Sequence, residues 1–266
     1  MSGIELNLMD RGHGAPAIVF IHGFTCNLSN WKEQFDTLSG SHRCVAVDLP
    51  GHGHSAESGE ATIEMLAKAV NDTLDALELN EVVLVGHSMG CRMVSEIFSQ
   101  SPGRVRGVVY VDGSIVASGD ADVAARRAVE MIDRVGMDGF LERLYEGFFV
   151  ESTPAAVRAF VNGGLPDINR GFAKRLWPNL VRWDALRSRA LLATIDVPAL
   201  VIQSTGLDEN LKRVSLASGQ TAPWMDAVST AINDVTVKVV PGVGHFPMLE
   251  APQQTNDAIS NFVRRF

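Results

Sequence analysis

The chain has 266 residues, and its hydrophobic content of 46% is enough to build a sizeable core in one large α/β domain or two small ones. Its formal charge of -8 argues against a nucleic acid or an anionic membrane surface as its partner. The sequence shows no secretion signal and no apolar run long enough to span a membrane, and its three widely spaced cysteines favour free thiols, so we expect a soluble, cytoplasmic protein.

Six apolar stretches along the chain end in turn-forming or polar residues, which predicts buried β-strands. Residues 62–78, 91–100 and 251–266 are predicted to be helices, the first and last from apolar side chains at spacings of three and four residues. Strands that alternate with helices in this way are typical of a mainly parallel sheet covered on both faces. The predicted strands are residues 15–23, 43–51, 81–88, 105–114, 197–205 and 235–242.

One long stretch interrupts this alternation, because residues 113–195 show helical periodicity and no convincing strand. Thr153-Pro154 and Gly163-Gly164 are signals for a helix start and a helix break within it. The stretch follows the carboxyl end of a strand, where open α/β sheets bind ligands, so we expect a helical lid over a site. The predicted domains are a core made of residues 1–112 and 196–266 and a cap made of residues 113–195.

The pentapeptide Gly-His-Ser-Met-Gly at residues 86–90 stands between a predicted strand and a predicted helix. It fits the nucleophile elbow G-x-S-x-G, in which the glycines allow a sharp turn that presents a hydroxyl near the N-terminus of a helix. A chance pattern in an ordinary strand-helix turn is the alternative. The strand-then-helix context favours the elbow, with Ser88 as the nucleophile.

Four motifs resemble those of the α/β-hydrolase superfamily and follow the same order along the chain. FIHGFTCNLSNW at residues 20–31 resembles its oxyanion loop, and DLPGHGHS at residues 48–55 resembles the turn after the next strand. GHSMG resembles the elbow, and PGVGHFPMLEAP at residues 241–252 resembles the catalytic-histidine loop. The resemblance implies an α/β fold with an eight-stranded, mostly parallel sheet, a helical lid inserted after the sixth strand, and a triad of nucleophile, acid and histidine.

His245, in the last of these motifs, is assigned as the general base, because a serine hydroxyl is too weakly acidic to ionise at neutral pH. Acyl transfer also needs preorganised donors aimed at the oxyanion of the tetrahedral intermediate. The resemblance implies that the main-chain N–H groups of Phe24 and Met89 supply them.

The third member of the triad is left open between two carboxylates. Asp208 follows the predicted strand at residues 197–205, but Ser204 occupies the place where the family pattern has a glycine, and an unusually long loop follows. Asp112 lies near the end of the predicted strand at residues 105–114, and a minority of the superfamily places the acid at this strand end. Glu209 is a third choice. Any of these carboxylates would orient the histidine and stabilise its imidazolium form.

The cap offers the only hint about the substrate, since arginines and lysines gather at residues 170–189 around Trp177 and Trp183. We favour solvated helix faces, with the two tryptophans packed on the core. The sharper hypothesis is a cavity for an aromatic or carboxylate-bearing ester, in which Trp177 and Trp183 bind the substrate.

A serine at the elbow distinguishes this chain from relatives that use an aspartate there. The reaction that remains for a serine nucleophile is acyl transfer. We expect a carboxylesterase acting on a small or medium, fairly apolar ester, with hydrolysis of lactones or of carbon–carbon bonds in diketones as alternatives. A slow-turnover small-molecule receptor is the alternative from another class. A metal site made of Asp48, His52 and His54 is conceivable, but turn-stabilising roles are favoured, so we predict no metal and no cofactor. The sequence leaves the oligomeric state open.

Overall fold

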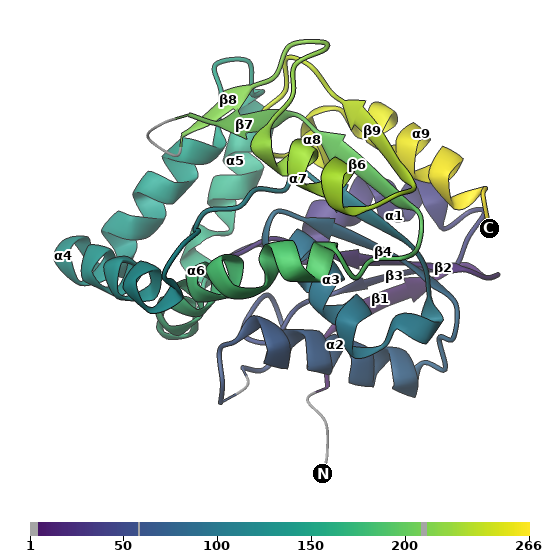
Figure 1. The fold of residues 1–266 in the computed structure, drawn as a ribbon, viewed down its shortest axis with the longest axis horizontal. Coiled ribbons are helices and arrows are strands. Elements are labelled where there is room, and N and C mark those ends of the chain that lie inside the picture. Colours follow the sequence, from purple (N-terminus) through teal and green to yellow (C-terminus); the bar gives the residue numbers. More distant parts are fainter. Residues whose placement is uncertain (1–4, 58, 209–211) are drawn as a thin grey trace.

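A seven-stranded sheet forms the centre of the computed structural model, which describes residues 5–57, 59–208 and 212–266 (Figure 1). The strands lie in the order β1-β3-β2-β4-β5-β6-β9, and every neighbouring pair is parallel except β1 with β3. All six predicted strands are present, and β1 is an additional strand at one edge. The bounds are β1 (Leu8–Arg11), β2 (Ala17–Ile21), β3 (Cys44–Val47), β4 (Val82–His87), β5 (Val105–Val111), β6 (Ala199–Gln203) and β9 (Val235–Val239).

Helices cover both faces of this sheet, which is why β2 to β6 consist of nearly continuous apolar runs. On one face, Phe20 of β2 packs against Trp31, and on the other Tyr110 of β5 packs against Trp224. The helices of the first face are α1 (Lys32–Leu38), α8 (Pro247–Glu250) and α9 (Pro252–Val263), and those of the second are α2 (Ile63–Ala76), α3 (Met89–Gln100) and α7 (Pro223–Ala231) (Figure 1). The described residues also include three short 3-10 helices: η1 (Leu28–Trp31), η2 (Pro102–Arg104) and η3 (Leu165–Asp167).

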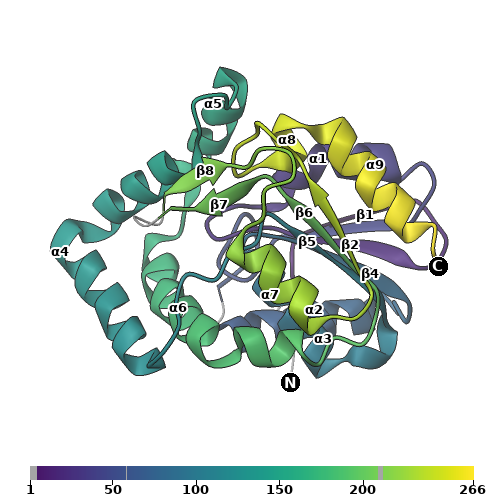
Figure 2. The same cartoon turned by 45° about the horizontal axis from the view of Figure 1, so that its top comes forward.

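The long stretch after β5 is helical, as its periodicity predicts, and consists of α4 (Ala121–Phe148), α5 (Ala155–Gly163) and α6 (Arg170–Leu192). Helix α5 begins after Pro154 and ends before Gly164, at the two predicted signals. Helix α4 is bent at Gly136, whose φ of 73° and ψ of 163° suit only glycine. Figure 2 shows α4 and α6 beside the sheet and α5 projecting from the molecule. The boundaries of a separate cap domain stay a prediction.

The chain after β6 forms a small hairpin where the sequence analysis expects a long loop. Its strands, β7 (Thr205–Leu207) and β8 (Arg213–Ser215), pair antiparallel with each other and not with the main sheet. We expected eight strands with the insertion after the sixth. The described residues give the main sheet seven strands, because β7 and β8 pair separately, and among these the insertion follows the fifth. In the same residues, no helix combines the length and apolarity that a membrane crossing requires.

Candidate active site

Ser88 stands at the sharp turn between β4 and α3, with a φ of 54° and a ψ of -112°. The turn requires glycines on either side. A Cβ on Gly86 would lie 2.2 Å from the carbonyl oxygen of Gly90, and one on Gly90 would lie 2.4 Å from the carbonyl oxygen of Ile21. The strained backbone therefore presents the Ser88 hydroxyl at the carboxyl edge of the sheet, next to the N-terminus of α3.

His245 reaches this hydroxyl from the loop between β9 and α8. Its Nε2 lies 3.1 Å from Ser88 Oγ, and its Nδ1 lies 2.7 Å from Asp112 Oδ2. The carboxylate of Glu250 accepts hydrogen bonds from the main-chain N–H groups on either side of the histidine, and His87 Nε2 lies 2.8 Å from the carbonyl oxygen of His245. The loop therefore holds the imidazole between a hydroxyl and a carboxylate.

Asp112 directly follows β5 and is fully buried, with a φ of 44°. Its Oδ1 accepts hydrogen bonds from the main-chain N–H groups of Ser204, at 2.9 Å, and Thr205, at 2.7 Å. Its Oδ2 accepts from the Thr205 hydroxyl at 2.6 Å and from Arg213 Nη1 at 3.1 Å, in addition to His245. Burial acts to raise the pKa of Asp112, but the hydrogen bond from His245 and the charge of Arg213 outweigh it and hold that pKa well below its ordinary value.

The same surroundings lower the pKa of His245 to about 4. Burial is the largest cause, because it disfavours the charged imidazolium, and the positive charge of Arg213 is the next. The hydrogen bond to Asp112 and the charge of that carboxylate act in the opposite direction. His245 is therefore neutral at neutral pH and able to accept a proton at Nε2.

The structure brings Asp112, and not Asp208, to the imidazole. Asp208 follows β7 in the hairpin, where its main-chain N–H donates to the carbonyl oxygen of Lys212 and its Oδ1 accepts from the N–H of Lys212, both at 2.9 Å. The physical reason is that β6 ends directly opposite Asp112 and the hairpin carries the following residues into their own pairing. Glu209, the third choice, lies outside the described residues.

Phe24 and Met89, expected to supply oxyanion donors, lie on either side of the nucleophile. Met89 is the first residue of α3, and the first N–H groups of a helix have no partner within it. A Cβ on Gly23, the residue before Phe24, would lie 3.2 Å from Ser88 Cβ, so the oxyanion loop passes directly beside the serine. The role of both N–H groups stays a prediction.

Aromatic rings from α4 and α6 lie beside Phe24 and His245, and only one of the two predicted tryptophans is among them. The ring of Trp177 packs 5.2 Å from that of Phe24 and 5.1 Å from that of Phe140, and the Phe148 ring lies 4.9 Å from that of His245. Trp183, which is also on α6, is instead buried against α3. The prediction that Trp183 binds substrate therefore finds no support in its position, because its indole N–H already donates to Glu96 at 2.9 Å.

The basic residues of the helical stretch after β5 form ion pairs, most of which lie at the surface. Five of those at residues 170–189 contact carboxylates, which agrees with solvated helix faces. These pairs are Arg170 with Asp138, Lys174 with Asp133, Arg175 with Glu57, Arg182 with Asp122, and Arg187 with Glu96.

The turn proposed as an alternative metal site is held together by hydrogen bonds. The Asp48 carboxylate accepts from the Asn7 side chain and from the main-chain N–H groups of Leu28 and His54, at 2.8 to 2.9 Å. The His52 Nδ1 lies 3.1 Å from the carbonyl oxygen of Pro50. Throughout the described ranges, no three His, Cys, Asp or Glu side chains form a group that could hold a metal ion.

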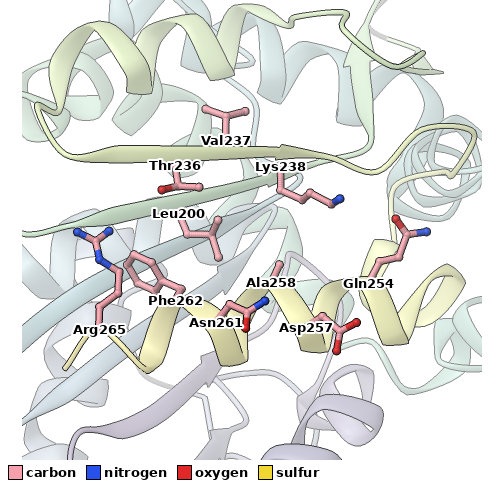
Figure 3. Close-up of a pocket in the computed structure, with 10 residues that line it drawn as sticks. All are labelled: Leu200, Thr236, Val237, Lys238, Gln254, Asp257, Ala258, Asn261, Phe262 and Arg265. Atoms are coloured by element: carbon pink, nitrogen blue, oxygen red, sulfur yellow. The ribbon is translucent and has the colours of Figure 1, made fainter.

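A shallow groove lies away from this site, at the sheet edge between β9 and α9 (Figure 3). None of the residues that line it belongs to the group around Ser88, so it is not part of the candidate active site. The residues labelled in the figure are Leu200, Thr236, Val237, Lys238, Gln254, Asp257, Ala258, Asn261, Phe262 and Arg265.

Three residues that surround the buried carboxylate were not predicted from the sequence: Ser204, Thr205 and Arg213. Ser204 drew attention only as a departure from a family glycine, yet its N–H and that of Thr205 both donate to Asp112. Arg213 carried no usable signal, since it stands in a stretch without clear periodicity and far from Asp112 in the sequence.

The comparisons with known proteins agree with the fold. Solved structures include an esterase from Thermogutta terrifontis, 26% identical, with a TM-score of 0.73 over 98% of this chain and 94% of that one. A curated relative, 2-(acetamidomethylene)succinate hydrolase from Mesorhizobium japonicum, is 28% identical over 98% of this chain and 92% of its own length. Three other curated relatives are longer, and the chain spans 16% to 65% of them; one is the Arabidopsis thaliana protein PHYLLO, 26% identical over 98% of this chain. The model of the alpha/beta hydrolase family matches residues 18–258, and the chain belongs to that family.

Proposed function

We propose that the chain is a serine hydrolase that cleaves carboxylic esters of small or medium, fairly apolar substrates through an acyl-enzyme. The observation that carries this proposal is the continuous hydrogen-bonded series from Ser88 through His245 to the buried Asp112. That geometry matches the roles of nucleophile, general base and orienting acid.

In the first half of the reaction, Ser88 Oγ attacks the ester carbonyl carbon while His245 Nε2 takes the hydroxyl proton. The N–H groups of Phe24 and Met89 stabilise the oxyanion that forms. The imidazolium then gives its proton to the leaving alcohol as the ester bond breaks. In the second half, His245 activates a water molecule that attacks the acyl-enzyme, which releases the acid and restores the serine.

The preference for an uncharged acyl group follows from the partners of the buried cations around the nucleophile. Arg92, on α3, donates to both oxygens of Asp184 and to the carbonyl oxygen of Ser114. Arg213 donates to Asp112. A carboxylate substrate would have to displace one of these buried partners, whereas an apolar acyl chain can pack on the aromatic rings of the cap. We therefore do not propose the substrate named for the Mesorhizobium relative, 2-(acetamidomethylene)succinate, as a substrate of this chain.

Labelling with a fluorophosphonate, followed by a substrate panel, tests the proposal. We expect the label on Ser88, turnover of p-nitrophenyl acetate to hexanoate, and a steep decline for long acyl chains. Ser88→Ala should lower kcat/KM by about 10³-fold or more while the protein stays folded. Near-normal turnover by Ser88→Ala rejects a serine hydrolase. Higher kcat/KM for lactones or diketones than for esters, or binding without turnover, would replace the carboxylesterase proposal with one of its alternatives. We further propose a cytoplasmic location and a small-molecule ester as the substrate, with neither a nucleic acid nor a membrane as a partner.

A further inference from the structure

Arg213 contacts the same oxygen of Asp112 that His245 uses. Its Nη1 lies 3.1 Å from Asp112 Oδ2 and 3.1 Å from Thr205 Oγ1, and its Nη2 lies 3.3 Å from Ser114 Oγ. The arginine is 7% exposed and comes from β8, in the separate hairpin after β6. Arg213 and the side chains of Asp112 and His245 therefore form one buried cluster.

The charges in this cluster oppose the protonation of His245. With a neutral imidazole, Asp112 and Arg213 balance each other, and adding a proton gives the buried cluster a net positive charge. Arg213 Nη1 and His245 Nδ1 share one oxygen at 3.1 and 2.7 Å, so the two nitrogens lie within about 6 Å of each other, where like charges repel. Without Arg213, the proton would instead neutralise the Asp112 charge.

The other charged or titratable groups around the imidazole do not have this effect to the same degree. They come from β4, α3 and α8, while α4 presents only the Phe148 ring to the imidazole. Burial keeps the His87 ring neutral, with a pKa well below its ordinary value, and Arg92 is paired with Asp184. Glu250 is used by the main chain on both sides of His245.

We propose that Arg213 is a positioning residue of the active site, which fixes Oδ2 of Asp112 and keeps the His245 imidazole unprotonated in acidic solution. The hairpin thus supplies a cation that sets the lower pH limit of the reaction. The kinetic part of this inference rests on the proposed serine-hydrolase function, but the protonation state of His245 can be measured without any substrate.

The test is a titration of His245 by NMR of the ring nitrogens and protons in the wild type, Arg213→Gln and Arg213→Lys, with the signal assigned by its loss in His245→Asn. Arg213→Gln should raise the pKa of His245 by about one to two units. Arg213→Lys retains the charge and should stay close to the wild type. Arg187→Gln is the matched control, since it removes a cation paired with the buried Glu96, a contact that involves neither Asp112 nor His245, and should leave the titration unchanged.

The kinetic readout is the acidic limb of the kcat/KM profile with p-nitrophenyl butyrate, which should move to higher pH by the same amount in Arg213→Gln alone. An unchanged titration of His245 in Arg213→Gln overturns the proposal, and so does an equal shift in Arg213→Lys. If Arg213→Gln does not fold, a wild-type His245 that titrates at or above the ordinary value of about 6.5 overturns it. A wild type that hydrolyses none of the panel rejects the proposed function, while the NMR titration still tests Arg213.

Discussion

Replacing Asp112 with asparagine should disable His245 by placing its proton on the wrong nitrogen. Oδ1 of Asp112 accepts two main-chain N–H groups, so the amide oxygen of the asparagine has to occupy this position. The amide nitrogen then takes the place of Oδ2, which lies 2.7 Å from His245 Nδ1. An amide N–H donates to Nδ1, and the neutral ring must carry its proton on Nε2, where it faces Ser88 Oγ and cannot accept a second one.

The magnitude follows from this change of tautomer. A triad whose acid becomes asparagine loses about 10⁴-fold in kcat, which corresponds to about 5.5 kcal/mol of transition-state stabilisation. The substitution also leaves the buried Arg213 without its carboxylate, which should cost about 3–5 kcal/mol of the free energy of unfolding. Both quantities should therefore change together in Asp112→Asn.

The assay is kcat for p-nitrophenyl butyrate at several pH values, after circular dichroism and a urea titration establish that the variant is folded. Asp208→Asn is the matched control, because Asp208 bonds to Lys212 within the hairpin, and its kcat should stay near that of the wild type. A folded Asp112→Asn with kcat within tenfold of the wild type refutes the reasoning. So does an Asp208→Asn variant that is damaged as severely.

Two further predictions concern stability. Asp184→Ala leaves the buried guanidinium of Arg92 without its carboxylate, so the free energy of unfolding in urea should fall by about 3–5 kcal/mol, and a loss below about 1 kcal/mol would contradict this. Burial lowers the pKa of His52 to about 3 and that of His87 well below its ordinary value, so below about pH 6.5 the unfolded chain binds protons that the folded chain does not. Stability should therefore decrease as the pH falls from 6.5, by about 1.4 kcal/mol per pH unit for each such histidine, and His52→Gln should reduce the slope by one proton. A free energy of unfolding that stays constant between pH 6.5 and 4.5 would show that the buried rings are not held neutral.

The sequence predicts those parts of the fold that are encoded locally. A recognisable pattern within a short window of residues marks the six apolar strands, the elbow at residues 86–90 and the helical stretch at residues 113–195. The β7–β8 hairpin does not, because strands of three residues are too short to show an alternating pattern.

The choice of acid and the role of Arg213 depend on contacts between distant residues. Asp112 meets His245 across 133 residues of sequence and Arg213 across 101. The register of β5 beside β6 decides which carboxylate faces the imidazole, and no local pattern carries that information. The motifs and their spacing favour Asp112 and Asp208 over the third choice, Glu209, as the triad acid, but do not decide between these two.

The pair between Arg92 and Asp184 also has a consequence for exchanging parts between related enzymes. Asp184, on α6, accepts the main-chain N–H of Val116 at its Oδ2, at 2.8 Å, and Val116 lies in the segment that leads from β5 into the helical insertion. The same carboxylate is paired with Arg92 on α3, the helix that follows Ser88. The first segment and the last helix of the insertion therefore meet at one carboxylate. A helical segment from a homologue, grafted between residues 116 and 184, would leave both of these contacts in place. A graft that replaces Asp184 has to replace Arg92 as well, since a buried guanidinium without a carboxylate would destabilise the chimera. An exchange that leaves residues 116 and 184 in place keeps these contacts, whereas an exchange of the whole insertion has to rebuild them.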